Sequence, residues 1–151
     1  MHFLTRIGDV VRRHGWKCHL FVLLTNHFHL LVQTRDESLP NGLQRLKLAT
    51  ACAFNRRYGS TGHLFEAPYG SELVTRQGHA VWLIRYLAMN PVRAGLCARP
   101  EDWPWSSYGA TVGLRAGPPW LTTGWILDLF AEDVALARQR LRAFVDGTRS
   151  P

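Results

Sequence analysis

The hydrophobic positions of the chain fall into blocks with either a helical or an alternating period. Residues 3–14 repeat apolar side chains at helical spacing, which predicts an amphipathic helix that ends at Gly15. The runs 16–24 and 27–33 are rich in strand-forming residues and are separated by two residues, which predicts an antiparallel hairpin. A second amphipathic helix is expected over 40–58.

The second half of the chain begins with a loop predicted over 59–70, where glycine and proline are frequent. A short strand is expected at 72–74, followed by a helix from about 75 to 90. Pro91 should end this helix, because proline disfavours helical geometry at the residue before it. A last helix is expected over 133–145, after an irregular tryptophan-rich stretch. Helices and a hairpin together indicate an α+β fold.

The charge of the chain narrows the choice of partners. The 18 Lys and Arg residues outnumber the 11 Asp and Glu residues, which gives a formal charge of +7. All of these basic residues except Lys17 and Lys47 are arginines, whose planar guanidinium groups suit bidentate contacts with phosphate. This balance favours a nucleic acid partner. A solvated basic surface without a partner is the alternative.

Cysteine usage and hydropathy indicate the expected environment. Cys18, Cys52 and Cys97 are odd in number and widely spaced, so neither a disulfide framework nor a zinc ribbon is indicated. No apolar run approaches the roughly 20 residues of a membrane-spanning helix. The charged start of the chain is unlike a signal peptide. We expect a soluble, cytoplasmic protein of one domain with no membrane partner.

Two histidines in the second predicted strand are the first candidates for chemistry. Alternate residues of a strand share a face, so His27 and His29 should be neighbours. Two imidazoles on a rigid strand are suitable ligands for a divalent metal ion. The alternative is that both are polar-face residues that point to solvent or make hydrogen bonds.

A tyrosine and an asparagine near the end of the third predicted helix are the next candidates. Tyr86 and Asn90 are four residues apart and therefore share a helix face. A metal ion that polarises a phosphate would allow attack by a tyrosine hydroxyl, and Asn90 offers a carbonyl oxygen as a ligand. Alternatively, Tyr86 is a core aromatic residue and Asn90 a helix cap before proline.

Three segments together resemble a known family. They read LTNHFHLLV at 24–32, YLAMNPVRAGL at 86–96 and WSSY at 105–108. This combination resembles the REP-associated tyrosine transposases, a branch of the IS200-like single-tyrosine HUH transposases. The resemblance extends from residue 3 to about residue 145.

The resemblance implies a fold and a division of the chain. The fold would be a ferredoxin-like HUH fold, with helices packed on an antiparallel sheet. Residues 1–110 would form the catalytic domain, and residues 111–151 a C-terminal helical extension packed on the same domain. Relatives usually begin with a strand that has no counterpart here, so an N-terminally shortened sheet is expected.

The resemblance also implies a reaction. Tyr86 would be the nucleophile, His27 and His29 paired metal ligands and Asn90 the third ligand, with Mg²⁺ or Mn²⁺ bound. Tyr86 would attack single-stranded DNA near a hairpin, such as a REP element, to form a 5′-phosphotyrosine link and a free 3′-hydroxyl. A second 3′-hydroxyl would reverse the step and join strands.

Contacts with DNA are expected from basic residues of the predicted helices. The candidates are Arg45, Lys47, Arg56, Arg57 and Arg76. The loop 62–71 carries Glu66, Pro68 and Gly70 where the family typically has glutamine and basic residues, which weakens the expected affinity. The missing N-terminal strand and this changed loop together make a catalytically inactive DNA-binding remnant the alternative function. An unrelated metal hydrolase is disfavoured, because a barrel that presents such a histidine pair needs roughly 200 residues. Monomer and homodimer both remain open.

Overall fold

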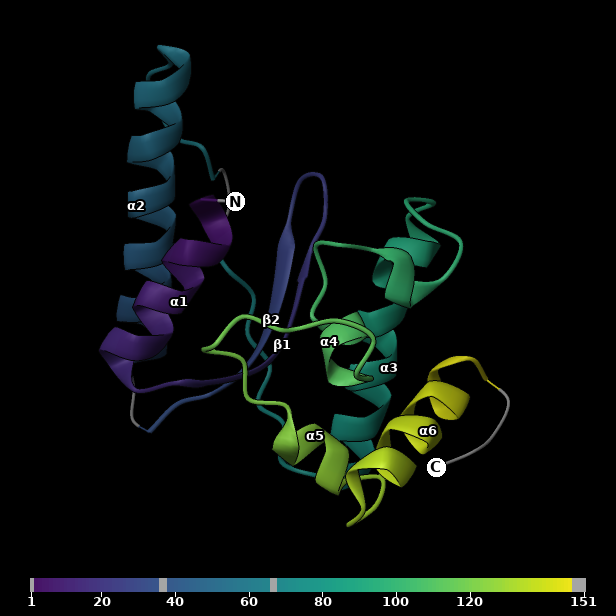
Figure 1. Ribbon diagram of the computed structural model, residues 1–151. Helices are drawn as coiled ribbons and strands as arrows, with labels where there is room; N and C mark the ends of the chain where they lie inside the picture. Colours follow the sequence, from purple (N-terminus) through teal and green to yellow (C-terminus); the bar gives the residue numbers. More distant parts are fainter. Residues whose placement is uncertain (1, 36–37, 66–67, 148–151) are drawn as a thin grey trace. The chain divides into compact units, whose positions relative to one another are not determined.

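The computed structural model describes residues 2–35, 38–65 and 68–147 (Figure 1). Over these residues it contains helices and one antiparallel sheet of two strands in the order β1-β2. The elements in chain order are α1 (His2–His14), β1 (Lys17–Leu23), β2 (Phe28–Gln33), α2 (Leu39–Tyr58), α3 (Gln77–Arg93), a 3₁₀ turn (Pro100–Asp102), α4 (Tyr108–Thr111), α5 (Gly124–Asp128) and α6 (Val134–Val145). None of the described helices combines the length and apolarity needed to cross a membrane.

The chain divides into two compact units, each built from two stretches of sequence. The first unit comprises residues 1–17 and 33–72, and contains α1 and α2. The second comprises residues 18–32 and 73–151, and contains the hairpin and all the elements from α3 onward. The predicted boundary after residue 110 stays a prediction, as does the ferredoxin-like arrangement.

The first unit is a packed pair of helices (Figure 1). The apolar face of α1 contributes Ile7, which is 1% exposed, and α2 contributes Leu46, also 1% exposed. Trp16 follows α1, and its indole Nε1 donates a hydrogen bond of 2.8 Å to Ser38 Oγ. A Cβ at Gly42 would overlap the ring of Trp16. Only glycine therefore allows α2 to approach this indole so closely.

The second unit has the larger core, in which β1 is central. Leu20 and Val22 of β1 are fully buried in one cluster with Ile84 of α3 and Leu141 of α6. Segments without strand structure complete the other edge of β1, since Leu23 N donates to Trp105 O at 2.8 Å. Further such bonds run from Ser107 N to Phe21 O and from Thr122 N to Cys18 O. The core thus fixes the hairpin and α3, the two elements that carry the candidate site.

Several predicted boundaries are confirmed. Gly15 and Gly59 take left-handed φ values of 62° and 64° at the ends of α1 and α2, where glycine avoids steric strain. The hairpin strands start and end within one residue of the predicted runs. The Asp133 side chain caps α6 by accepting a hydrogen bond of 2.8 Å from Leu136 N.

Two predictions about the middle of the chain are wrong. Residues 72–74 form no strand, because a strand needs a place in a sheet and the described sheet consists of β1 and β2 alone. The third helix continues to Arg93 with Pro91 inside it. Pro91 is buried, and Ala94 N donates to Asn90 O at 2.9 Å, so packing and the next helical turn outweigh the lost hydrogen bond.

Candidate active site

The histidine pair lies where the hairpin turn enters β2. His27 precedes the strand and is exposed, whereas His29 is the second residue of β2 and is half-buried. Their ring centroids are 5.0 Å apart, and the ring planes are nearly perpendicular at 88°. The predicted closeness of the two rings is confirmed, and their nitrogens can converge on one ligand.

Hydrogen bonding distinguishes the nitrogens of the two rings. His27 Nδ1 lies 2.7 Å from Asn26 Oδ1. Because an amide oxygen only accepts, Nδ1 must carry a proton, so in the neutral ring the lone pair is on Nε2. His29 Nε2 is buried and has no hydrogen-bond partner among the described residues. Burial, followed by the charge of His27, lowers the pKa of His29, which favours its neutral form.

The candidate nucleophile lies beside this pair on α3. The Tyr86 ring meets the His29 ring edge-on, with their centroids 6.4 Å apart. The Tyr86 ring also stacks on Trp82, and the guanidinium carbon of Arg93 lies 5.2 Å from its centroid. Tyr86 is half-buried at the border of the main core. Hairpin and helix thus bring together two residues that are distant in sequence.

Asn90 lies one helical turn after Tyr86. Its Nδ2 donates a hydrogen bond of 3.2 Å to the Tyr86 backbone carbonyl, inside the same helix. This bond fixes which end of the amide faces the helix, so Oδ1 is the end available to a ligand. The placement agrees with the shared face predicted from the spacing of the two residues.

The donor atoms fit a divalent cation. Two neutral imidazole nitrogens and an amide oxygen are all acceptable ligands, and the unpartnered buried nitrogen of His29 is an atom that a cation would satisfy. Among the described residues no three His, Cys, Asp or Glu side chains cluster as a metal site. A site here would therefore depend on Asn90 as its third protein ligand.

The predicted DNA-contacting residues belong to different units. Arg45, Lys47, Arg56 and Arg57 lie on α2 in the first unit, whereas Arg76 immediately precedes α3 in the second. All of them except the half-buried Lys47 are exposed. Lys47 Nζ lies 5.5 Å from the centroid of Phe65. Glu66, the predicted departure from the family's basic loop, lies outside the described residues, and the structure gives Pro68 and Gly70 no regular structure.

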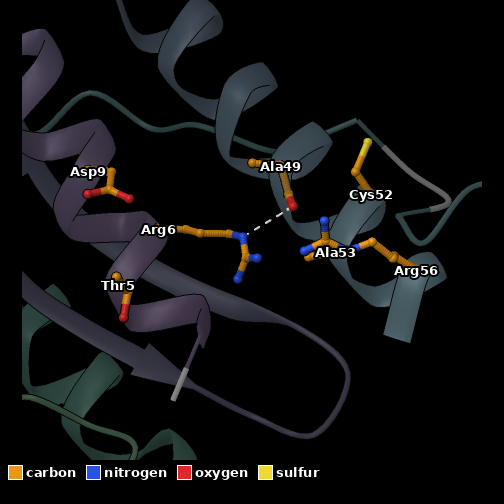
Figure 2. Close-up of a pocket in the computed structure, with 7 residues that line it drawn as sticks. All are labelled: Thr5, Arg6, Asp9, Ala49, Cys52, Ala53 and Arg56. Carbon is orange, nitrogen blue, oxygen red and sulfur yellow. Dashed lines mark hydrogen bonds between the residues drawn. The ribbon is translucent and has the colours of Figure 1, made fainter. Parts of the chain in front are cut away.

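A surface hollow of about 460 Å³ in the first unit is lined by residues of α1 and α2 (Figure 2). Arg56 and Arg6 both line it. The Nε atom of Arg6 donates a hydrogen bond of 3.1 Å to Ala49 O across the hollow. The acidic Asp9 lines the same space. Arg6 was not among the residues predicted to contact DNA.

Three further residues of the candidate site were also missed. Asn26, Trp82 and Arg93 contact His27 or Tyr86 directly. Asn26 was detectable, because asparagine in a tight turn often bonds a neighbouring group. Trp82 was detectable from its spacing of four residues from Tyr86. Arg93 was not, because its reach across two turns depends on a side-chain conformation.

The comparisons with known proteins add one likeness. No family model matches the chain, and no curated protein matches it. A solved structure described as a REP-associated tyrosine transposase bound to a REP hairpin matches with a TM-score of 0.63. The fold is similar to that of this transposase. The alignment covers 80% of this chain and 71% of the transposase chain, with 18% sequence identity. At this identity the likeness concerns the arrangement of the backbone.

Proposed function

We propose that the chain is a metal-dependent nuclease and strand transferase that acts on single-stranded DNA, in transposition or in REP-hairpin processing. The observation that supports this most is the position of Tyr86, whose ring lies 6.4 Å from that of His29 on a separate element. A nucleophile beside a pair of candidate metal ligands is an arrangement suited to metal-assisted transfer of a phosphoryl group to a side chain. The likeness in fold to a transposase bound to a DNA hairpin supports the same reaction class.

His27 and His29 would hold a divalent cation through their Nε2 atoms, and Asn90 through Oδ1. When bound, Mg²⁺ or Mn²⁺ would supply positive charge to polarise the target phosphate. The amide of Asn26 would keep His27 in the tautomer that leaves Nε2 free. The contact between Asn90 Nδ2 and the Tyr86 carbonyl would keep Oδ1 turned away from the helix backbone.

Tyr86 would then exchange one phosphate ester for another. Its hydroxyl oxygen attacks phosphorus, and the bond from phosphorus to the 3′-oxygen breaks. The leaving oxygen takes the bonding electron pair and is protonated to a free 3′-hydroxyl, while the tyrosine proton is lost. The 5′-phosphotyrosine retains the ester bond, so attack by another 3′-hydroxyl joins strands without an external energy source.

The basic residues predicted to contact DNA keep that role in the proposal. Arg45, Arg56 and Arg57 are exposed on α2, so their guanidinium groups are available to phosphates. Arg76 would serve the same purpose next to the start of α3. Such contacts position a strand without reading its sequence.

The deciding experiment looks for a covalent link to DNA. The protein, Tyr86→Phe and the control Tyr58→Phe are incubated with end-labelled hairpins of randomised stem and single-stranded flanks, with Mn²⁺ or with EDTA. Tyr58 is an exposed tyrosine of α2 in the other unit. We expect a protein–DNA adduct with the parent and Tyr58→Phe, in Mn²⁺ only.

Two outcomes would contradict the proposal. An adduct that persists in Tyr86→Phe would exclude Tyr86 as the nucleophile. Hairpin binding by the parent protein without any adduct would support the alternative, an inactive DNA-binding protein.

A further inference from the structure

The side chain of Trp82 is unusually placed for a tryptophan. It lies on α3, and 58% of its surface is exposed. Its helix neighbours Val81 and Ile84 are buried, at 6% and 0%, so α3 itself is well packed on the core. Trp82 lies on the other face of the helix, which it shares with Tyr86 and Asn90 at intervals of four residues.

Trp82 and Tyr86 form a stacked pair. Their ring centroids are 5.3 Å apart and their planes are nearly parallel at 11°. A stack of this kind holds the indole flat against the tyrosine and leaves much of its surface exposed to solvent. Tryptophan offers a large, rigid π surface, which is the group that single-strand-binding proteins use to stack nucleobases.

The charge beside the stack favours a polyanion. Arg93 is exposed, and its guanidinium carbon lies 5.2 Å from the centroid of the Tyr86 ring. Helix α3 contains no acidic residue over its whole length, so no carboxylate of this helix offsets that charge. An apolar protein partner would gain nothing from this cation. A strand that carries both bases and phosphates would contact the π surface and the cation together.

We propose that Trp82 is a nucleobase-stacking residue that holds the DNA strand beside Tyr86, with Arg93 contacting a phosphate of the same strand. The proposal rests on the proposed function, because it requires a single strand at Tyr86. It adds a binding contact for a base next to the scissile phosphate. Stacking tolerates any base, so this contact would fix the position of the strand and leave sequence selection to other residues.

The test separates a contact with a base from a contact with the backbone. Fluorescein-labelled 12-nucleotide oligothymidylate and a fully abasic strand of equal length are titrated by anisotropy, in EDTA, against the parent protein. The variants are Trp82→Ala, Trp82→Phe and, as the control, Trp105→Ala, which removes another exposed indole of the same unit. Far-UV circular dichroism confirms that each variant is folded.

We expect the parent to prefer the thymine strand. Trp82→Ala should narrow this preference roughly 5- to 150-fold, the range that follows from removing one stacking aromatic. Trp82→Phe should recover most of the preference, because a phenyl ring keeps a π surface. The abasic strand should bind the parent and Trp82→Ala almost equally, and Trp105→Ala should behave like the parent.

The other outcomes overturn the inference. An unchanged thymine preference in Trp82→Ala, or an equal loss on both strands, would show that Trp82 contacts no base, and would leave the proposed function intact. If the parent bound neither strand nor the randomised hairpins, the proposed function and the inference would fail together. If Trp82→Ala were unfolded, Trp82→Leu would replace it, because leucine keeps apolar bulk without a π surface.

Discussion

Two asparagines orient the candidate site at the scale of single residues. Asn26 contacts His27 through an amide oxygen, and Asn90 contacts the Tyr86 carbonyl through an amide nitrogen. Each contact selects one of two chemically distinct ends of a side chain, a ring nitrogen in His27 and the carbonyl oxygen in Asn90. The proposed ligand atoms are therefore specified by hydrogen bonds inside the hairpin turn and inside α3.

Asn26→Ala should weaken metal binding. Without the amide, the His27 ring is free to rotate and to change tautomer, and losing such a contact typically costs about 10- to 100-fold in affinity. Isothermal titration of Mn²⁺ into the apoprotein measures the effect. Thr25→Ala, at the adjacent turn position, should bind like the parent. Equal affinity of Asn26→Ala and the parent would show that the amide does not support a ligand.

The ligand chemistry also predicts a preference among metals. His27 and His29 would supply nitrogen atoms, and the proposed set has no carboxylate. Mg²⁺ favours oxygen ligands and gives up water reluctantly, whereas Mn²⁺ accepts imidazole more readily. We expect Mn²⁺ to bind more tightly than Mg²⁺ in the same titration, and His29→Ala to abolish the difference. Tighter binding of Mg²⁺ would contradict the proposed ligand set.

Among whole helices and strands, the hydrophobic period predicts some elements and not others. The α1 and α2 helices and the hairpin follow from local patterns, because their apolar faces and terminal glycines are local features. Pro91 inside α3 does not, since its cost is offset by burial against elements distant in sequence. The expected strand at 72–74 failed for a related reason, because strand formation depends on a neighbour that the pattern does not reveal.

The close approach of α2 to Trp16 predicts a large effect from one methyl group. Gly42→Ala should destabilise the protein by about 1–3 kcal/mol, because its Cβ would overlap the indole and the ring is held by its bond to Ser38. Urea denaturation followed by tryptophan fluorescence measures the change. Gly78→Ala is the matched control at an open helical position. At the second residue of α3 it should raise stability by less than about 1 kcal/mol, and a loss of similar size in both variants would exclude a specific overlap at Gly42.

The charge of the whole molecule should make DNA binding depend strongly on salt. Each phosphate contact releases a bound counterion, so affinity falls as salt rises. Arg57→Ala should reduce the slope of log affinity against log salt by about 1 for a lost contact. Arg99→Ala should leave the slope unchanged, because Arg99 is already bonded to Asp102 at 3.1 Å. Equal slopes for Arg57→Ala and the parent would exclude Arg57 from the interface.

At the scale of the whole molecule, only part of the candidate site could be predicted from the sequence. The spacing of His27 and His29, and that of Tyr86 and Asn90, indicated two pairs that share a face. The ring centroids of His29 and Tyr86 lie 6.4 Å apart because of the tertiary structure, and only the family resemblance anticipated this closeness. The spacing of Trp82 and Tyr86 places them on one helix face, but the contact from Arg93 depends on a side-chain conformation, which no linear pattern encodes.

The interleaving of the two units has a consequence for how the site can form. The chain passes between them after residues 17, 32 and 72, so no single cut separates one from the other. The hairpin that carries the histidines is synthesised before α2, and its partner Tyr86 only after α2. The contact between His29 and Tyr86 therefore closes a long loop of the chain, and such contacts form slowly during folding. A fragment starting at residue 73 would keep Tyr86 and Asn90 and lose both histidines proposed as metal ligands.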